Sequence, residues 1–403
     1  MSNTIENVPV APVPEWNSDA LTEREVEGFA AFTEQWNHDR AQWAEFDQAN
    51  RDRLAAGKLS LEWMNTDGSN WGTKVKPSSR GLTMDDINRP RCYGTVPGTT
   101  TYRDTTPRGS VREPYRHRLP EMANFVLTEK WDLWSDNVSV LYEEAKFRQW
   151  NATKDIAWDE LEPVNEQLEK AACQLATVLT EIEFAAGDFP AHFIAQIPND
   201  YLEVKLFLST QVMDEARHLE VFRKRALAGG GGLLHVTPQF QWAIKALLMT
   251  PSHSLGGFFL NLLGEGMILS LFRAGEFLSH TPVDREIFRL CLQDEARHVA
   301  FGTIEMKHYL EHHPTPDAAL EQLHRYADMV EPSIESSVLE PTVLEPLALL
   351  MGDGLDDIDA GMEGVAFLWS VIREEYLQRC DRAGFERRER CALLNEMPWN
   401  SAA

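Results

Sequence analysis

From about Phe125 onward, apolar residues recur every three or four positions, which is the spacing of an amphipathic helix. Alternating runs of β-branched residues, which would indicate strands, are almost absent. A glycine run at 229–232 and a series of prolines divide the pattern into segments: Pro190, Pro198, Pro238, Pro251 and Pro282. The predicted helices lie near residues 126–150, 159–188, 200–226, 237–249, 253–279, 282–312, 316–328, 331–350 and 357–384. The pattern therefore predicts an all-α protein.

The first 120 residues have a different character. Residues 1–19 are polar with three prolines and are expected to be disordered, and residues 21–56 are typical of a polar amphipathic helix. Residues 57–120 are rich in Gly, Pro, Thr and Arg without a period, which predicts a long irregular segment. We therefore predict an N-terminal extension over 1–120, a helical bundle over 121–312, and C-terminal helices over 313–403 that pack on the bundle.

The pentapeptide Asp-Glu-Ala-Arg-His occurs twice, at Asp214–His218 and at Asp294–His298. Each copy contains a Glu-x-x-His pair, and residues three apart project from the same face of a helix. Such a pair directs a carboxylate oxygen and an imidazole nitrogen toward a common point. In a four-helix bundle, two such helices and one glutamate from each of two others form a dimetal site.

The sequence supplies both further glutamates. Glu265 lies 30 residues before Glu295, among phenylalanines and leucines, where a lone ionised carboxylate would cost several kcal/mol unless a cation neutralised it. On the helix before Glu215, Glu181 and Glu183 point about 200° apart, so they cannot both face the metals. Glu183 lies about 80° and Glu181 about 120° from the centre of the apolar face. We therefore predict six ligands: Glu183, Glu215, His218, Glu265, Glu295 and His298.

Four carboxylates and two imidazoles suit iron or manganese better than zinc. We expect two Fe ions, with Fe/Mn and Mn/Mn pairs as alternatives. Asp214 and Asp294 precede the two repeated glutamates, and each is expected to accept a hydrogen bond from the far nitrogen of a metal-bound histidine. The structural alternative is a set of internal Glu–Arg–His ion pairs without metal. His253, His280, His308, His312 and His313 are interpreted as surface or capping groups.

Three stretches carry a resemblance to a known family: "KFRQWNATKDIAW" at 146–158, "QVMDEARHLEVF" at 211–222 and "LGEGMILSLF" at 263–272. The region 141–310 resembles the ferritin-like superfamily of dimetal carboxylate proteins, in particular the ribonucleotide reductase small subunit and its ligand-binding oxidase relatives. The resemblance implies a ferritin-like four-helix bundle with a dimetal site, to which this chain adds extra N- and C-terminal helices.

Two positions depart from relatives within that superfamily. Reductase small subunits usually carry a radical-storing tyrosine four residues after the first metal histidine, where this chain has Phe222. Arylamine N-oxygenases carry an extra histidine four residues before the second Glu-x-x-His pair, where this chain has Cys291. Both residues are candidate pocket residues, and a seventh metal ligand is not expected.

Composition limits the partners and the compartment. The net charge of −25 disfavours nucleic acid and anionic membranes. The five scattered cysteines and an N-terminus without a signal-peptide pattern predict a cytoplasmic protein. "LGGFFLNLLGEGMILSLF" is interrupted by Glu265 and is interpreted as a buried helix rather than a membrane span.

The favoured function is an O2-activating dimetal monooxygenase or oxidase that acts on a small, largely apolar or aromatic molecule. No flavin, nicotinamide or iron–sulfur motif is apparent, so an external donor such as a ferredoxin and its reductase is expected to supply electrons. No catalytic residue beyond the metal ligands is predicted, and a homodimer is expected. The alternatives are a radical-carrying reductase subunit, whose docking tail would be "CALLNEMPWNSAA" without a tyrosine, and a non-enzymatic ferritin-like iron protein.

Overall fold

The computed structural model describes residues 44–58, 137–194, 202–229, 231–250, 252–313 and 315–399, with isolated positions between them. The chain forms two compact units, Met1–Trp71 and Gly72–Ala403. Among the described residues of the first unit, helix α2 covers Ala44–Ala55 and lies within the helix predicted over 21–56. The predictions for residues 1–19 and for most of 57–120 fall outside the described residues. The predicted domain boundaries at 120 and 312 stay predictions.

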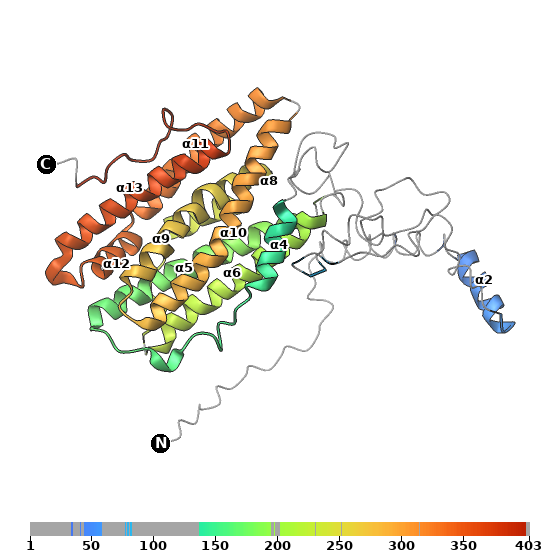
Figure 1. Cartoon of the computed structure of the whole chain (residues 1–403), viewed down its shortest axis with the longest axis horizontal. Coiled ribbons are helices and arrows are strands. Elements are labelled where there is room, and N and C mark those ends of the chain that lie inside the picture. The colour runs from blue at the N-terminus through green and yellow to red at the C-terminus, as the bar shows by residue number, and fades with distance from the viewer. Residues whose placement is uncertain are drawn as a thin grey trace, which may run out of the picture. The chain divides into compact units, whose positions relative to one another are not determined.

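Four helices of the second unit lie side by side and form a bundle: α5 (Glu166–Ile194), α6 (Leu202–Ala228), α9 (Glu265–Leu278) and α10 (Pro282–His312) (Figure 1). Helix α5 packs along α6, and α9 packs along α10. Helices α5 and α6 run in opposite directions. Glu169 near the start of α5 pairs with Arg225 near the end of α6, and Gly187, later in α5, approaches Glu215, earlier in α6. The bundle is therefore antiparallel, and no β-strand occurs in the described part of the chain, which confirms the all-α prediction.

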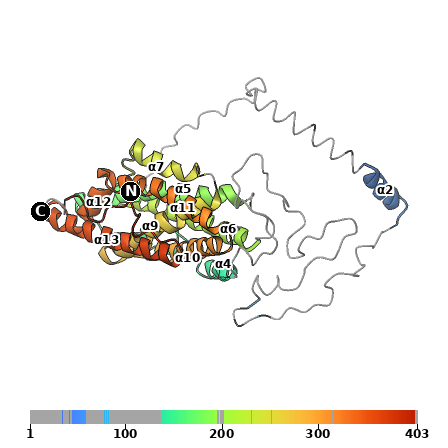
Figure 2. The same cartoon turned by 90° about the horizontal axis from the view of Figure 1, so that it is seen from above.

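Further helices cover the bundle on several sides (Figure 2). Helix α4 (Asn137–Phe147) packs on α6 and α10, and α7 (Pro238–Leu248) packs on α5 and α11 (Pro316–Val338). Helix α12 (Pro341–Met351) packs on α5, and α13 (Ile358–Arg382) packs on α12 and α9. The short helix α8 (His253–Gly257) and a π-helix, η6 (Phe258–Gly264), lead directly into α9. Two 3₁₀ turns, η4 (Trp158–Glu160) and η7 (Leu355–Asp357), complete the described elements.

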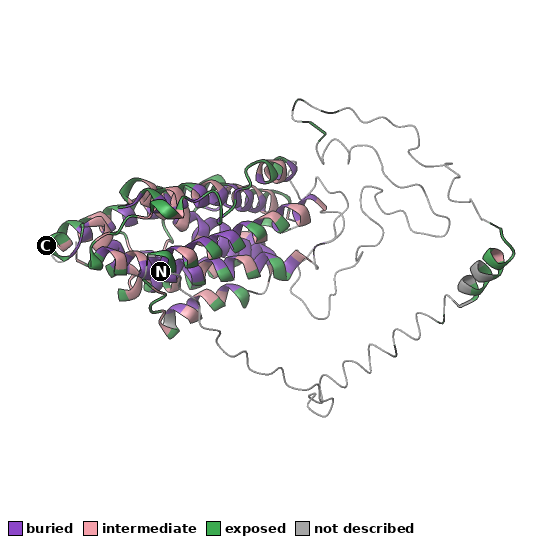
Figure 3. Cartoon of the chain, turned by 90° about the horizontal axis from the view of Figure 1, so that it is seen from below, coloured by how far each residue is buried: buried purple, intermediate pink, exposed green. Residues whose placement is uncertain are grey.

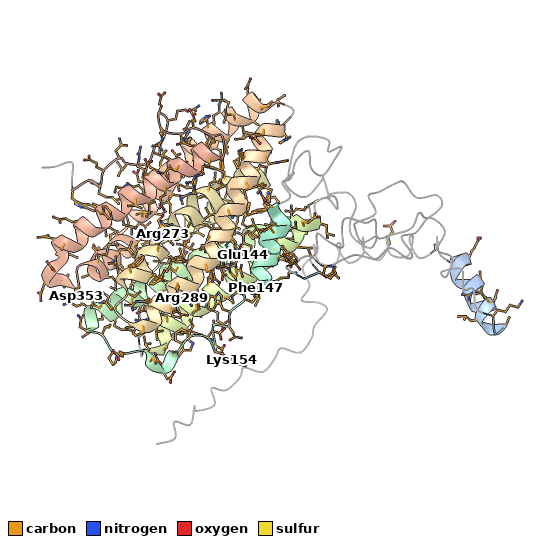
Figure 4. All side chains as sticks on the ribbon, in the orientation of Figure 1. Glu144, Phe147, Lys154, Arg273, Arg289 and Asp353 are labelled. Carbon is orange, nitrogen blue, oxygen red and sulfur yellow. The ribbon has the colours of Figure 1, made fainter. Side chains whose placement is uncertain are left out.

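Buried residues concentrate on the inward faces of the bundle helices, and exposed residues lie on the outer faces (Figure 3). Arg273 on α9 and Arg289 on α10, labelled in Figure 4, are exposed examples. The stretch His253–Leu278 is long and apolar enough to cross a bilayer, but 78% of its most apolar window is buried inside the protein. This burial agrees with the expectation of a core helix.

Several helix boundaries differ from the prediction. Helix α5 begins at Glu166 instead of 159, after an extended stretch that contains Pro163, and continues through Pro190 to Ile194. The break predicted between 328 and 331 is also wrong, because α11 continues through Pro332 to Val338. An interior proline costs a helix about 3 kcal/mol, and tertiary packing can offset that cost. At Pro190 the neighbouring Phe189 and Phe193, 2% and 1% exposed, supply such packing.

Candidate metal centre

The bundle brings the six predicted ligand side chains together. Glu183 comes from α5, Glu265 from α9, and the two Glu-x-x-His pairs come from α6 and α10. All six are buried, with at most 3% of each residue exposed. They form two groups, Glu183–Glu215–His218–Glu295 and Glu215–Glu265–Glu295–His298, and one potential ligand atom from each member lies within 4.8 Å of the others. Glu215 and Glu295 belong to both groups, so the two groups are adjacent and together could hold two neighbouring cations.

The contacts inside each group favour cations over a set of ion pairs alone. His218 Nδ1 lies 3.2 Å from Glu215 Oε2, 3.3 Å from Glu295 Oε1 and 3.6 Å from Glu183 Oε2. One ring nitrogen carries at most one proton, so it cannot donate to three carboxylates. His298 Nδ1 has the same surroundings, at 3.0 Å from Glu215 Oε1 and 3.5 Å from Glu295 Oε2.

Several oxygens of the site also lack a hydrogen bond of acceptable geometry. These buried atoms are Glu183 Oε1, Glu215 Oε1 and both carboxylate oxygens of Glu295. Buried polar atoms in folded proteins are almost always satisfied, and orphaned acceptors that converge on one point fit a metal ion. The residues present therefore fit two oxygen- and nitrogen-liganded cations.

Electrostatics support the same interpretation. Burial raises the pKa values of Glu183 and Glu265 well above the ordinary value. Burial lowers the pKa of His298, but the charges of Glu215 and Glu265 outweigh this effect and the pKa lies well above 6.5. The metal-free site therefore holds protons among its carboxylates and imidazoles. Metal ions would replace these protons, so metal affinity should rise with pH.

The repeated aspartates and arginines form a crossed network behind the histidines. His218 Nε2 lies 3.3 Å from Asp294 Oδ2, and His298 Nε2 lies 3.3 Å from Asp214 Oδ2. Each aspartate therefore meets the histidine of the opposite repeat, which keeps the Nδ1 side of both rings directed at the metal positions.

Arg217 and Arg297 connect the two aspartates. Arg217 Nη2 donates to Asp294 Oδ2 at 2.9 Å and also contacts Asp214, while Arg297 Nη2 donates to Asp214 Oδ2 at 2.9 Å and also contacts Asp294. Both guanidinium groups are buried. Four of the five repeated residue types thus have a place in the centre, and the two alanines, Ala216 and Ala296, are exposed.

Sequence reasoning did not assign these arginines, nor three other neighbours of the site. Trp150 Nε1 donates to Asp294 Oδ2 at 2.7 Å. Gln211 Nε2 and Asn261 Nδ2 donate to the two oxygens of Glu265 at 2.8 and 2.6 Å. Gln211 precedes Glu215 by four residues and Asn261 precedes Glu265 by four, a helical spacing that could have indicated both. A Cβ on Gly302 would lie 2.2 Å from Asn261 Cβ, so the glycine leaves space for the amide.

The remaining predicted residues have definite places. Glu183 is 2% exposed and Glu181 is exposed, as the register predicted, although a ligand role for Glu183 stays a prediction. Phe222 is buried against Phe272, with ring centroids 5.6 Å apart. Cys291 is fully buried, and burial raises the pKa of its thiol to about 12.

The surface or capping interpretation of His253 is wrong. His253 is 1% exposed, and its Nδ1 lies 3.0 Å from Glu305 Oε1. No local sequence pattern predicts this partner, which lies on α10, 52 residues further along the chain. His280 and His312 are exposed, as expected.

An apolar cavity of about 170 Å³ adjoins the centre. Its wall includes the carboxylates Glu183, Glu265 and Glu295, which together belong to both ligand groups. The rest of the wall is almost entirely aliphatic and aromatic and comes from α5, α7, η6, α9, α11, α12 and α13. A second apolar cavity of about 70 Å³, lined in part by Phe222, lies next to it. Cys291 lines neither of these two cavities.

No family model and no curated protein matches this sequence. Solved structures of R2-like ligand-binding oxidases are similar to it. Two are single-residue mutants with an aerobically reconstituted Mn/Fe cofactor, each with a TM-score of 0.48 and 21% identity over 62% of this chain and 94% of that chain. A third, with an aerobically reconstituted Mn/Fe cofactor after a long soak, has a TM-score of 0.48 and 20% identity over 62% of this chain and 93% of that chain. At this level the similarity by itself assigns no activity to the chain.

Proposed function

We propose that this chain is a dimetal oxidoreductase of the O2-activating monooxygenase or oxidase class, and that it acts on a small apolar molecule. The observation that carries the proposal is the position of the apolar cavity, which contacts ligand carboxylates of both metal groups. A buried site with four carboxylates and two imidazoles suits iron or manganese. An apolar chamber at such a site binds a substrate and excludes water from the reaction.

Two reduced iron or manganese ions, when bound, would supply the O2 chemistry. The residues of the chain hold and orient the reactants. Three glutamates line the cavity and so connect it to the metal site: Glu183, Glu265 and Glu295. Two ion pairs hold the imidazoles in one orientation: Asp214–Arg297 and Asp294–Arg217. In a monooxygenation, one oxygen atom enters a substrate C–H bond and the other leaves as water, which consumes two electrons and two protons.

An external donor, such as a ferredoxin with its reductase, is proposed to supply those two electrons. Sustained product formation from the purified protein, O2 and substrate alone would contradict this part of the proposal, unless the substrate itself is the reductant. A diiron centre is the first choice for the cofactor, with Fe/Mn and Mn/Mn pairs as the alternatives. We also propose that the protein is cytoplasmic and forms a homodimer.

A radical carrier is the second candidate, and one observation favours it. The indole of Trp150 donates to Asp294, which in turn contacts His218, so a redox-active ring is connected by hydrogen bonds to a predicted metal ligand. The absence of a hydroxyl at Phe222, four residues after His218, disfavours a stored tyrosyl radical there. A simple iron store has no evident use for the apolar cavity.

Metal loading followed by turnover tests the proposal. The full-length protein is loaded anaerobically with Fe(II), with Mn(II) or with both, and metal content is measured after desalting. We expect two ions per chain and, with a chemical or ferredoxin-type reductant, O2-dependent oxidation of members of a panel of small apolar molecules. A Glu215→Ala/Glu295→Ala variant should lose both ions. Metal content near zero in the wild-type protein, or unchanged content in this variant, would refute the dimetal site.

A further inference from the structure

The two apolar cavities share part of their walls. Four leucines line both cavities: Leu175 and Leu179 on α5, Leu271 on α9 and Leu347 on α12. A side chain that lines two adjacent cavities lies between them. We propose that these four leucines form a partition that limits the size of the substrate's apolar part. This inference rests on the proposed function, because it concerns the cavity that the proposed substrate would occupy.

The order of residues along the helices supports a partition. On α5, Glu183 borders the larger cavity, Leu179 and Leu175 border both, and Leu168 borders only the smaller one. The residues at 175, 179 and 183 are four apart, so they lie in one row on the same helix face.

Helices α9 and α12 repeat this order. On α9, Glu265 borders the larger cavity, Leu271 borders both, and Leu278 borders only the smaller one. On α12, Val343 borders the larger cavity, Leu347 borders both, and Met351 borders only the smaller one. Three helices thus place the partition at one level of the bundle, roughly 6–12 Å along the helix axes from Glu183 and Glu265.

The size of the larger cavity defines the occupant. An engineered apolar cavity of about 150 Å³ in another protein stays dry and binds benzene. The larger cavity, at about 170 Å³, therefore accepts a group of the size of one six-membered ring or a short alkyl chain. A longer group must enter the smaller cavity, and it can do so only if the leucines move or are removed.

The far end of the smaller cavity favours a neutral occupant. Arg225 lines that end, but its guanidinium donates to Glu169 Oε1 and Oε2 at 2.9 and 3.0 Å and also contacts Asp284. With its charge balanced by two carboxylates, Arg225 offers little attraction to an anionic head group. We therefore infer that the substrate class is a neutral compound with a single ring or a short alkyl group.

A homologous series of n-alkylbenzenes, from benzene to hexylbenzene, tests the inference on the metal-free, full-length protein. Dissociation constants are measured by titration calorimetry, and thermal shifts are recorded in parallel. For the wild-type protein, affinity should rise over the first members and then fall at a cut-off. Leu271→Ala opens the partition and should move the cut-off to longer chains, with each newly buried methylene strengthening binding about fourfold. Leu271→Phe should move the cut-off to shorter chains.

Leu320→Ala is the matched control, because Leu320 is a partly buried leucine on α11 that lines neither cavity. Its cut-off should equal that of the wild-type protein. If Leu271→Ala does not fold by circular dichroism, Leu347→Ala takes its place with the same expected shift. A wild-type protein without a cut-off, or an unchanged cut-off in the folded opened variant, would overturn the partition.

Metal-loaded protein separates the two proposals. If the cut-off shifts as expected but no alkylbenzene or other apolar compound is oxidised, the partition stands and the proposed oxygenase function fails. If oxidation occurs and Leu271→Ala leaves the cut-off unchanged, the function stands and the partition is refuted.

Discussion

Asp294→Asn perturbs the charge balance behind the metal ligands while it preserves side-chain size. Asp294 is 0% exposed, accepts from Trp150 Nε1 at 2.7 Å and from Arg217 Nη2 at 2.9 Å, and lies 3.3 Å from His218 Nε2. Burial raises the pKa of this carboxyl. The opposite effects are larger and hold the pKa well below its usual range: the hydrogen bond and charge of His218, and the charges of Arg297 and Arg217. The substitution leaves two buried guanidinium groups with one shared carboxylate.

The expected effect has two parts. Removing one partner of a buried ion pair costs about 3–5 kcal/mol of folding free energy. At about 2–4 °C per kcal/mol for a domain of this size, the thermal midpoint of the metal-free protein should fall by about 6–20 °C. Loss of the acceptor that orients His218 should also weaken metal binding about 10- to 100-fold.

Chemical denaturation of the metal-free protein and chelator competition of the loaded protein measure the two effects separately. Asp284→Asn is the matched control, because Asp284 pairs with Arg225 on the same two helices, about 15 Å closer to the start of α10. The control should lose stability and keep its metal affinity. Wild-type metal affinity in Asp294→Asn, or an equal loss of affinity in the control, would refute the orienting role of Asp294.

Three further outcomes are expected. Glu183→Ala should abolish activity and release one metal ion per chain. Glu181→Ala, at an exposed position two residues away, should keep the wild-type metal content. The reverse result by elemental analysis would show that the helix register was misread. For His218 and His298, burial lowers the pKa but neighbouring groups outweigh it, so both folded-state pKa values lie well above 6.5. The two protonated histidines therefore stabilise the metal-free protein fully below about pH 6.5, and this stabilisation is lost as pH rises through their folded-state pKa values. Over that range the thermal midpoint should fall and metal affinity should rise. A thermal midpoint that does not depend on pH would contradict this assignment. Because Phe222 has no hydroxyl, electron paramagnetic resonance after O2 exposure of the reduced protein should show no stable tyrosyl signal coupled to the metals, and a persistent signal would favour the radical carrier.

The local part of the site could be predicted because helix geometry fixes it. A Glu-x-x-His pair shares a helix face wherever the helix lies, and the apolar stripe on α5 selects Glu183 over Glu181 without any knowledge of neighbouring helices. The same argument placed Glu265 in an apolar stripe. The structure buries Glu183 and Glu265 and leaves Glu181 exposed, in agreement with this reasoning.

Helix ends were predicted well where a cap or a glycine marks them, and poorly where packing decides. Thr281 accepts from the backbone of Asp284 and precedes Pro282, and α10 begins at that proline, as predicted. Pro190 and Pro332 carry the same local signal as other helix-breaking prolines, yet α5 and α11 continue through them. Neighbouring helices supply the stabilisation that the local sequence lacks.

The sequence by itself determined the helical class, the faces of the helices and the six candidate ligands, because these depend on interactions within four residues along the chain. Only the tertiary structure decided which partner each buried polar group meets. The crossed contacts of Asp214 with His298 and of Asp294 with His218 require α6 and α10 to pack antiparallel at one register, and the pairing of His253 with Glu305 requires α8 to meet α10. The apolar cavity is likewise a space between eight helical elements. Its shape follows from how these elements pack, and periodicity within a single helix does not reveal that packing.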